Sequence, residues 1–254
     1  MKLRILGCSG GIGAQTRTTS FKLDDDILID AGTGIEDLSV EELTAIDHVF
    51  LTHSHLDHIA ALPLLVDSVG HLRKKPVIVH ALPDTIAALR AHIFNWVIWP
   101  DFTEIPHYDR PYMMFEPIVV GASVEVGGRR IKALPANHTV PALGYQMSGP
   151  TGTLIFSGDT SPNDEFWQIV NSVRDLKALI IETAFSNRDQ DLAMLAKHLF
   201  PIQLGRELQK LKVETELYVT HLKPSDRATI TREVIDWVGR FDPIMLERNM
   251  VIEV

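Results

Sequence analysis

The chain has a single cysteine, Cys8, among its 254 residues. It therefore cannot form an internal disulfide or a cluster of thiolate ligands, and any bound metal must be held by nitrogen and oxygen atoms. No stretch approaches the roughly 20 consecutive apolar residues that a membrane-spanning helix needs. The apolar part of the N-terminal segment "MKLRILGCSGGIG" is too short for a secretion signal. We therefore expect a cytoplasmic protein with no membrane partner.

Positive charge is also scarce. The chain has 24 lysines and arginines against 33 acidic residues, a formal net charge of −9, and it has no long basic run. A protein that follows a long polyanion needs a positively charged stripe, whereas a small phosphate needs positive charge only within its own site. The composition therefore disfavours a nucleic-acid polymer as partner and leaves a small phosphorylated substrate open.

Low-complexity segments, flexible linkers and fixed-period repeats are absent as well. The sequence does have short apolar runs that predict strands, namely "KLRIL", "DILID", "HVFLT", "PVIVHA", "TLIFS", "ALIIET" and "ELYVTH". Helical patterns separate many of them, at 38–45, 83–93, 162–174, 200–210 and 226–239. Strands and helices that alternate over residues 1–254 predict one α/β or layered α+β domain.

Local signals refine three of these elements. The helix that begins near Pro162 has Ser161 as its predicted N-cap. Residues 56–60 are predicted to form an irregular turn, and the next helix is expected to start just before Pro63. The glycines of "GCSGGIG" are assigned to turns in a first hairpin, because no strand–helix–strand unit follows them as dinucleotide binding would require.

Acidic or imidazole side chains recur where the predicted strands end. They are Asp30, His53, Asp159, Glu182 and His221. One such residue is usually a cap or a turn former. Five of them predict that one edge of the sheet forms a polar cleft.

The densest group of polar residues lies in "THSHLDH", at residues 52–58. His53 and His55 are two positions apart, which directs both side chains to one face of an extended chain. Asp57 and His58 follow where the chain turns and can reach the same region. Three imidazoles and a carboxylate suit zinc or a similar divalent ion. The alternative is a polar loop with unrelated histidines, which the tight spacing disfavours.

One ion takes about four ligands, and these four side chains cannot all surround a single ion without strain. We therefore expect two ions and further ligands from other strand ends. The candidates are His138, Asp159 and His221. Taken alone, His138 could equally be a loop histidine, Asp159 a helix cap and His221 a strand-end group that bonds backbone.

The order of these motifs along the chain, H-x-H-x-D-H, a lone His, the Asp of "SGDT" and the His of "YVTH", resembles the metallo-β-lactamase superfamily. The resemblance implies a four-layer αββα sandwich with a dinuclear metal site at one edge of its two sheets. It assigns His53, His55 and His138 to the first ion, Asp57, His58 and His221 to the second, and Asp159 to a bridging position. Zinc is the expected metal, and the same ligands accept manganese or iron.

Within that superfamily, "THSHLDHIAALPLLVDS", "HIFNWVIWPDF" and "KHLFPIQLGREL" are similar to the class II cyclic-nucleotide phosphodiesterases. This resemblance implies that a hydroxide between the two ions attacks the phosphorus of cyclic AMP or cyclic GMP and yields the 5′-monophosphate. Asp57 would accept or orient the hydroxide's proton, and His198 would protonate the departing 3′ oxygen. Sequence alone does not choose between the two cyclic nucleotides.

Other residues receive supporting roles in this interpretation. Lys223 is a candidate phosphate contact or else a solvated lysine. Asp30 and Glu182 are expected to accept the second N–H of ligand imidazoles and so fix their tautomers, although Asp30 could instead cap its loop. The aromatic-rich segment at 92–115, which includes Trp99, could stack a purine or form a dimer contact, and we expect a homodimer.

Three alternatives remain. The tRNA 3′-processing endonucleases share the histidine cluster and "SGDT", but this acidic chain lacks a basic extension and has Leu56 between the second His and the Asp, where those enzymes usually have Gly. Thioester or lactam hydrolysis is a third enzymatic possibility. A metal-binding regulatory module without catalysis is the non-enzymatic alternative, and the complete set of seven ligands disfavours it.

Overall fold

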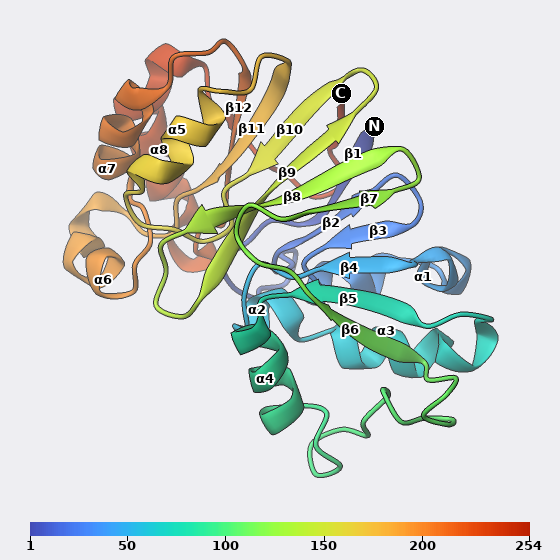
Figure 1. The fold of residues 1–254 in the computed structure, drawn as a ribbon. Helices are drawn as coiled ribbons and strands as arrows, with labels where there is room; N and C mark the ends of the chain where they lie inside the picture. Colours follow the sequence, from blue (N-terminus) through green and yellow to red (C-terminus); the bar gives the residue numbers. More distant parts are fainter.

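Two seven-stranded β-sheets stack face to face and carry helices on their outer surfaces (Figure 1). The structure is a computed structural model that describes residues 1–254. The first sheet contains, in spatial order, β14 (Val251–Glu253), β1 (Lys2–Gly7), β2 (Ser20–Leu23), β3 (Ile27–Ile29), β4 (His48–Phe50), β5 (Val77–Ala81) and β6 (Met113–Pro117). The second contains β13 (Ile244–Met245), β12 (Glu216–Thr220), β11 (Leu176–Glu182), β10 (Gly152–Phe156), β9 (Ala142–Gly149), β8 (Arg129–Ala136) and β7 (Ser123–Val126).

The helices are short and lie mostly outside the sheets. They are α1 (Val40–Ala45), α2 (Leu56–Ile59), α3 (Leu62–Val69), α4 (Pro83–His92), α5 (Asp164–Val170), α6 (Gln190–Leu195), α7 (Pro201–Glu207) and α8 (Arg227–Val238). Single turns of 3₁₀-helix span Thr33–Asp37, Gly70–Leu72, Asn187–Asp189, Leu208–Lys210, Pro224–Asp226 and Gly239–Phe241. No helix is both long and apolar enough to cross a membrane.

Apolar residues on both faces of the central strands build the four layers. In β11, Ala178 and Ile180 join the core between the two sheets. Leu179 and Ile181, which alternate with them, face the other way into the core beneath α5, α7 and α8. A third core packs α3 and α4 against the outer face of the first sheet. Strands that are covered on both faces have continuous apolar sequences, which is why they could be predicted from the sequence.

Parallel pairing places several strand ends at one edge. The strands β3, β4, β5 and β6 run parallel to one another, and so do β10, β11, β12 and β13. The two sheets meet at that edge, where the Leu143 N–H donates to the Thr52 carbonyl at 2.9 Å. Because the carboxyl ends of parallel strands lie at the same edge, the residues that follow them are brought together.

The layered α/β fold expected from the sequence is confirmed, and all seven predicted strands are present. Two local predictions were wrong. The N-cap of α5 is Asn163, whose side chain accepts the Phe166 N–H at 3.2 Å, because Ser161 is already engaged with the Asn137 carbonyl. Residues 56–59 form a turn of α-helix rather than an irregular turn, with the Ala60 N–H donating to the Leu56 carbonyl at 2.8 Å.

Candidate metal centre

The first group of side chains at the shared edge consists of His53, His55 and His138. Their ligand atoms all lie within 4.8 Å of one another. His53 follows β4 and is fully buried, His55 is the N-cap residue of α2, and His138 follows β8. The His138 Nε2 atom lies 3.1 Å from His55 Nδ1. Three residues from two sheets therefore present imidazoles to one point.

The second group consists of Asp57, His58, Asp159 and His221, whose ligand atoms also lie within 4.8 Å of one another. Asp159 occupies the central position. Its Oδ2 atom is 3.2 Å from His58 Nε2, 3.3 Å from His221 Nε2 and 3.8 Å from His53 Nε2, so it adjoins both groups. Asp57 Oδ2 is 3.6 Å from His221 Nε2. All seven residues singled out as ligands from the sequence thus lie together.

Unpaired buried atoms show that these residues suit a divalent cation. The Nε2 atoms of His53, His58 and His221 and the Oδ1 atom of Asp159 are buried and have no hydrogen-bond partner. Buried polar atoms nearly always have a hydrogen-bond partner, so four buried atoms without one at the same place indicate a positively charged ligand. Imidazole and carboxylate donors without thiolate fit zinc, manganese or iron.

A hydrogen bond at the opposite ring nitrogen holds each of the inner imidazoles. His58 Nδ1 donates to the Asp30 carboxylate at 2.7 Å, and His138 Nδ1 donates to the Lys197 carbonyl at 3.1 Å. His53 Nδ1 lies 3.0 Å from the Thr52 hydroxyl, and His221 Nδ1 lies 3.3 Å from the Thr19 hydroxyl. Such contacts fix ring orientation and leave Nε2 free to bind an ion. Of these four contacts, only the one from Asp30 was predicted from the sequence.

Burial and mutual contact set the charge state of the cluster. Burial lowers the pKa of His221 to about 3 and that of His138 to about 4, and it lowers the pKa of His53 well below its usual range. These three rings are therefore neutral at pH 7, which is the form that binds metals. His58 differs, because burial acts to lower its pKa but the carboxylates of Asp159 and Asp30 outweigh it and raise that pKa well above its usual range. Burial acts to raise the pKa of Asp159, but the imidazoles of His221 and His58 outweigh it and hold that pKa well below its usual range.

Glu182 and His198 form a second buried carboxylate–imidazole pair beside the cluster. His198 Nδ1 donates to Glu182 Oε1 at 2.8 Å, and the Thr160 N–H donates to the same oxygen at 3.0 Å. A ring nitrogen of His198 lies within 4.8 Å of ligand atoms of His138 and Asp159. The imidazole that Glu182 holds is therefore that of His198 and not one of the seven predicted ligands.

The two predicted substrate contacts, Lys223 and Trp99, lie in different parts of the structure. Lys223 lies two residues after His221, donates to the Gly10 carbonyl at 2.6 Å and lies over the Phe185 ring. Trp99 packs against the core on the outer face of the first sheet, with Phe94 and Phe102 buried beside it. Its segment follows α4 and lies at the end of that helix away from α2 (Figure 1). The stacking role of Trp99 stays a prediction.

Comparison with known proteins agrees with this geometry. Residues 25–222 match the family described as Beta-lactamase superfamily domain. A probable 3′,5′-cyclic-nucleotide phosphodiesterase of Yersinia pestis is 28% identical over 206 residues, which is 71% of this chain and 58% of that protein. A ribonuclease Z of Kineococcus radiotolerans is 25% identical over 261 residues, 84% of this chain and 81% of that protein. The crystal structure of unliganded yeast PDE1 has a TM-score of 0.83 and 18% identity, covers 100% of this chain and 99% of its own, and shows the same fold.

Proposed function

The chain belongs to the metallo-β-lactamase superfamily, and from that premise we propose that it is a phosphodiesterase that hydrolyses 3′,5′-cyclic nucleotides to 5′-nucleoside monophosphates. The observation that carries the proposal is the convergence of seven nitrogen and oxygen ligands with four unpaired buried atoms among them. The similarity to the Yersinia phosphodiesterase supports the choice of reaction.

Two divalent ions held by these residues would lower the pKa of water in the site and offset negative charge as it builds on the phosphoryl oxygens. The first would be held by His53, His55 and His138, and the second by Asp57, His58 and His221, with Asp159 between them. In the reaction, the oxygen of water bonds to phosphorus, the bond from phosphorus to the 3′ oxygen breaks, and that oxygen gains a proton.

The protein's own groups handle the two protons. Asp57 is a quarter exposed and its Oδ2 faces His221 and His58, so it can orient the attacking water and accept its proton. His198 is the proposed proton donor to the 3′ oxygen, because its ring lies beside the cluster and Glu182 fixes its Nδ1–H. General acid catalysis of this kind typically contributes about 10²–10⁴-fold to a rate.

The choice of leaving group tests the role of His198. We compare the wild type with His198→Asn on cyclic AMP and on bis-p-nitrophenyl phosphate, whose nitrophenolate leaves without a proton. The expected result is a loss of about 10²–10⁴-fold on cyclic AMP and a small loss on the nitrophenyl ester. His71→Asn, a substitution in the 3₁₀ turn Gly70–Leu72, is the matched control. Equal losses on both substrates would reject the acid role.

A panel of substrates tests the proposed activity itself. The metal-loaded protein is incubated with cyclic AMP, cyclic GMP, pre-tRNA and a thioester, with and without chelator. We expect chelator-sensitive release of a 5′-nucleotide from a cyclic substrate. The second candidate function is tRNA 3′ processing, which the similarity to ribonuclease Z favours and the net charge of −9 disfavours. Cleavage of pre-tRNA with cyclic nucleotides untouched would select it, and metal binding without turnover of any substrate would indicate a regulatory module.

A further inference from the structure

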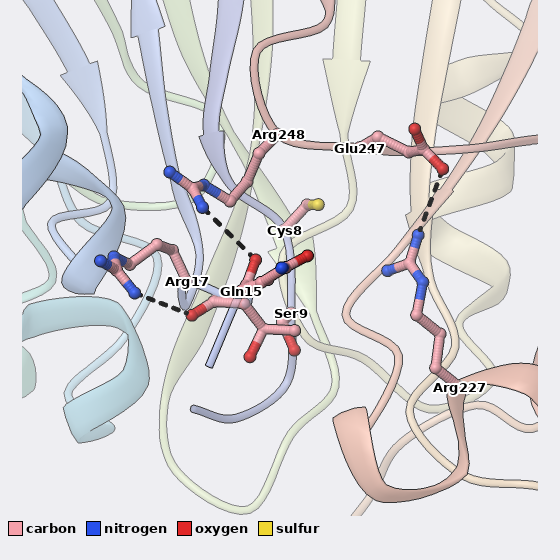
Figure 2. Close-up of a pocket in the computed structure, with 8 residues that line it drawn as sticks. Cys8, Ser9, Gln15, Arg17, Arg227, Glu247 and Arg248 are labelled. Atoms are coloured by element: carbon pink, nitrogen blue, oxygen red, sulfur yellow. Dashed lines mark hydrogen bonds and ion pairs between the residues drawn. The ribbon is translucent and has the colours of Figure 1, made fainter. Parts of the chain in front are cut away.

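A cavity of about 400 Å³ lies on the far side of the chain segment that supports His221, and three arginines line it (Figure 2). Arg17 comes from the loop after β1, Arg227 begins α8, and Arg248 lies between β13 and β14. Figure 2 shows Arg17 and Arg248 on one side of Cys8 and Ser9, and Arg227 on the other. Three arginines from distant parts of the sequence therefore line one cavity, in a chain that is acidic overall.

Few of the hydrogen-bond donors on these arginines are used. The Nε atoms of Arg17 and Arg248 have no partner. Arg17 donates only to the carbonyl of its neighbour Thr16 at 3.3 Å, and Arg227 donates to the Leu246 carbonyl at 3.2 Å. Arg248 donates to Asp37 at 2.5 Å and, at a long 3.4 Å, to the Gln15 carbonyl. The two Nε atoms are buried, but each guanidinium carries five N–H donors, so several other donors have no partner within the protein.

Nearby carboxylates pair with all three arginines, closely at Arg248 and more loosely at Arg17 and Arg227. Arg17 lies 3.7 Å from Asp37 and 4.0 Å from Glu36, and Arg227 lies 3.9 Å from Glu247. None of these three pairs is within hydrogen-bond distance. Exposed ion pairs of that kind contribute little free energy, so an oxyanion with better geometry can replace them.

The remainder of the lining is polar and contains no aromatic residue. Ser9, Gln15 and Thr16 provide hydroxyl and amide groups, and Cys8 is the single hydrophobic member. The lining therefore offers no aromatic ring on which a nucleobase could stack. Glu247 can accept hydrogen bonds from hydroxyl groups but would repel a bare anion. The lining therefore fits a ligand that carries both an oxyanion and hydroxyl groups.

We propose that this cavity binds a small sugar phosphate. The guanidiniums of Arg17 and Arg248, on one side of the cavity, bind the phosphate, and Arg227, Ser9, Gln15 and Glu247 bind the sugar hydroxyls. The volume lies within the range of small-molecule sites. The inference does not depend on the reaction at the metal centre, because none of the cavity residues is a predicted metal ligand.

The cavity is nevertheless close to the metal centre through the backbone. The Cys8 carbonyl accepts the His221 N–H at 2.9 Å and the Thr220 hydroxyl at 3.2 Å. A phosphate could also bind at the metal centre, so the experiment must separate the two locations. Substitutions of the arginines do this, because they remove donors from the cavity and leave the seven predicted ligands unchanged.

Isothermal titration calorimetry of the metal-loaded protein tests the proposal, with ribose 5-phosphate as the probe. We expect Arg227→Gln and Arg248→Gln each to weaken binding roughly tenfold to a hundredfold, since a hydrogen bond to a charged group contributes that much. Arg248→Lys should lie between the wild type and Arg248→Gln, because it keeps the charge and loses the paired donors. Arg240→Gln, at an exposed arginine over the Phe241 ring, is the matched control and should bind as the wild type does.

Two further arms identify the ligand class. Inorganic phosphate and adenosine 5′-monophosphate should bind at least tenfold more weakly than ribose 5-phosphate, and ribose should not bind. Ribose 5-phosphate binding that the Arg227 and Arg248 variants leave unchanged would place the ligand at the metal centre and overturn the proposal. Absence of ribose 5-phosphate binding to the wild type, or equal affinity for inorganic phosphate, would overturn it as well.

Discussion

The carboxylate of Asp30 offers a direct test of how the metal centre is built. It is fully buried and is not one of the seven clustered residues. Its Oδ1 atom accepts the Thr52 N–H at 2.7 Å, and its Oδ2 atom accepts the His58 Nδ1–H at 2.7 Å. Asp30 therefore connects the end of β4 to a ligand imidazole and holds that ring with Nε2 toward Asp159.

The substitution Asp30→Asn keeps the shape of the side chain and removes both its charge and one acceptor. The amide has one oxygen, so its NH₂ group must face either the Thr52 N–H or the His58 Nδ1–H. A buried donor left unpaired costs about 1–3 kcal/mol of unfolding free energy. Loss of a carboxylate behind a ligand imidazole typically weakens metal binding about 10–100-fold, which corresponds to about 1.4–2.8 kcal/mol.

Competition with a chelator measures the affinity of each ion, and urea unfolding in chelator measures the stability of the protein without metal. The control is Asp47→Asn, because Asp47 also accepts two side-chain donors, from Arg73 and Lys75, but precedes β4 at its opposite end. We expect Asp47→Asn to retain wild-type metal affinity. If Asp30→Asn also bound both ions within twofold of the wild type, Asp30 would be a purely structural residue and the reasoning would be refuted.

Two further predictions concern the free energy of unfolding and involve Glu42 and Tyr145, which lie outside the metal centre. Burial acts to raise the pKa of Glu42, but hydrogen bonds, led by that from Lys22, outweigh it and lower the pKa to about 2. Because the folded pKa is depressed, Glu42 stabilises the protein above its ordinary pKa of about 4.5 and loses that effect as pH falls toward 2. Glu42→Gln should cost about 1 kcal/mol at pH 7 and less at pH 3 in urea unfolding, and an equal cost at both pH values would contradict this. Tyr145→Phe should lower the free energy of unfolding by about 1–2 kcal/mol in the same assay, because the Tyr145 hydroxyl donates to the buried Leu51 carbonyl at 2.7 Å. An unchanged free energy of unfolding would show that the carbonyl accepts a hydrogen bond from another donor.

The strands that the sequence predicted are continuous apolar runs, and most of those it missed contain polar residues or glycine. β7 reads "SVEV" and exposes part of its surface, and β9 reads "ALGYQMSG" with two glycines. Glycine in a strand lowers its predicted propensity, yet Gly144 is needed in β9 because a Cβ atom there would lie 2.6 Å from the Phe156 carbonyl oxygen. Contacts of this kind arise only when β9 and β10 pair, so a single segment does not reveal them.

The metal ligands were predictable because their residue types are rare and their spacing is tight. The groups that hold them are less visible. Thr52 adjoins His53 and could have been included from its position, but Thr19 lies at the start of a strand that the sequence did not predict. The support for His138 is the backbone carbonyl of Lys197, which any residue could supply. Its position depends on tertiary packing alone.

Three residues at the site have a left-handed backbone conformation, which differs from that of an ordinary strand. Asp30 follows β3 with φ of 59°, and His221 follows β12 with φ of 69°. Lys197, whose carbonyl holds His138, has φ of 53°. Three of the seven non-glycine residues with left-handed φ thus serve the metal centre, although this conformation costs roughly 1–2 kcal/mol for residues with a Cβ atom. This strain lies beside the seven clustered side chains, where it turns Asp30 and His221 out of the alternating strand pattern and toward the cluster, as expected when function rather than stability sets the local backbone.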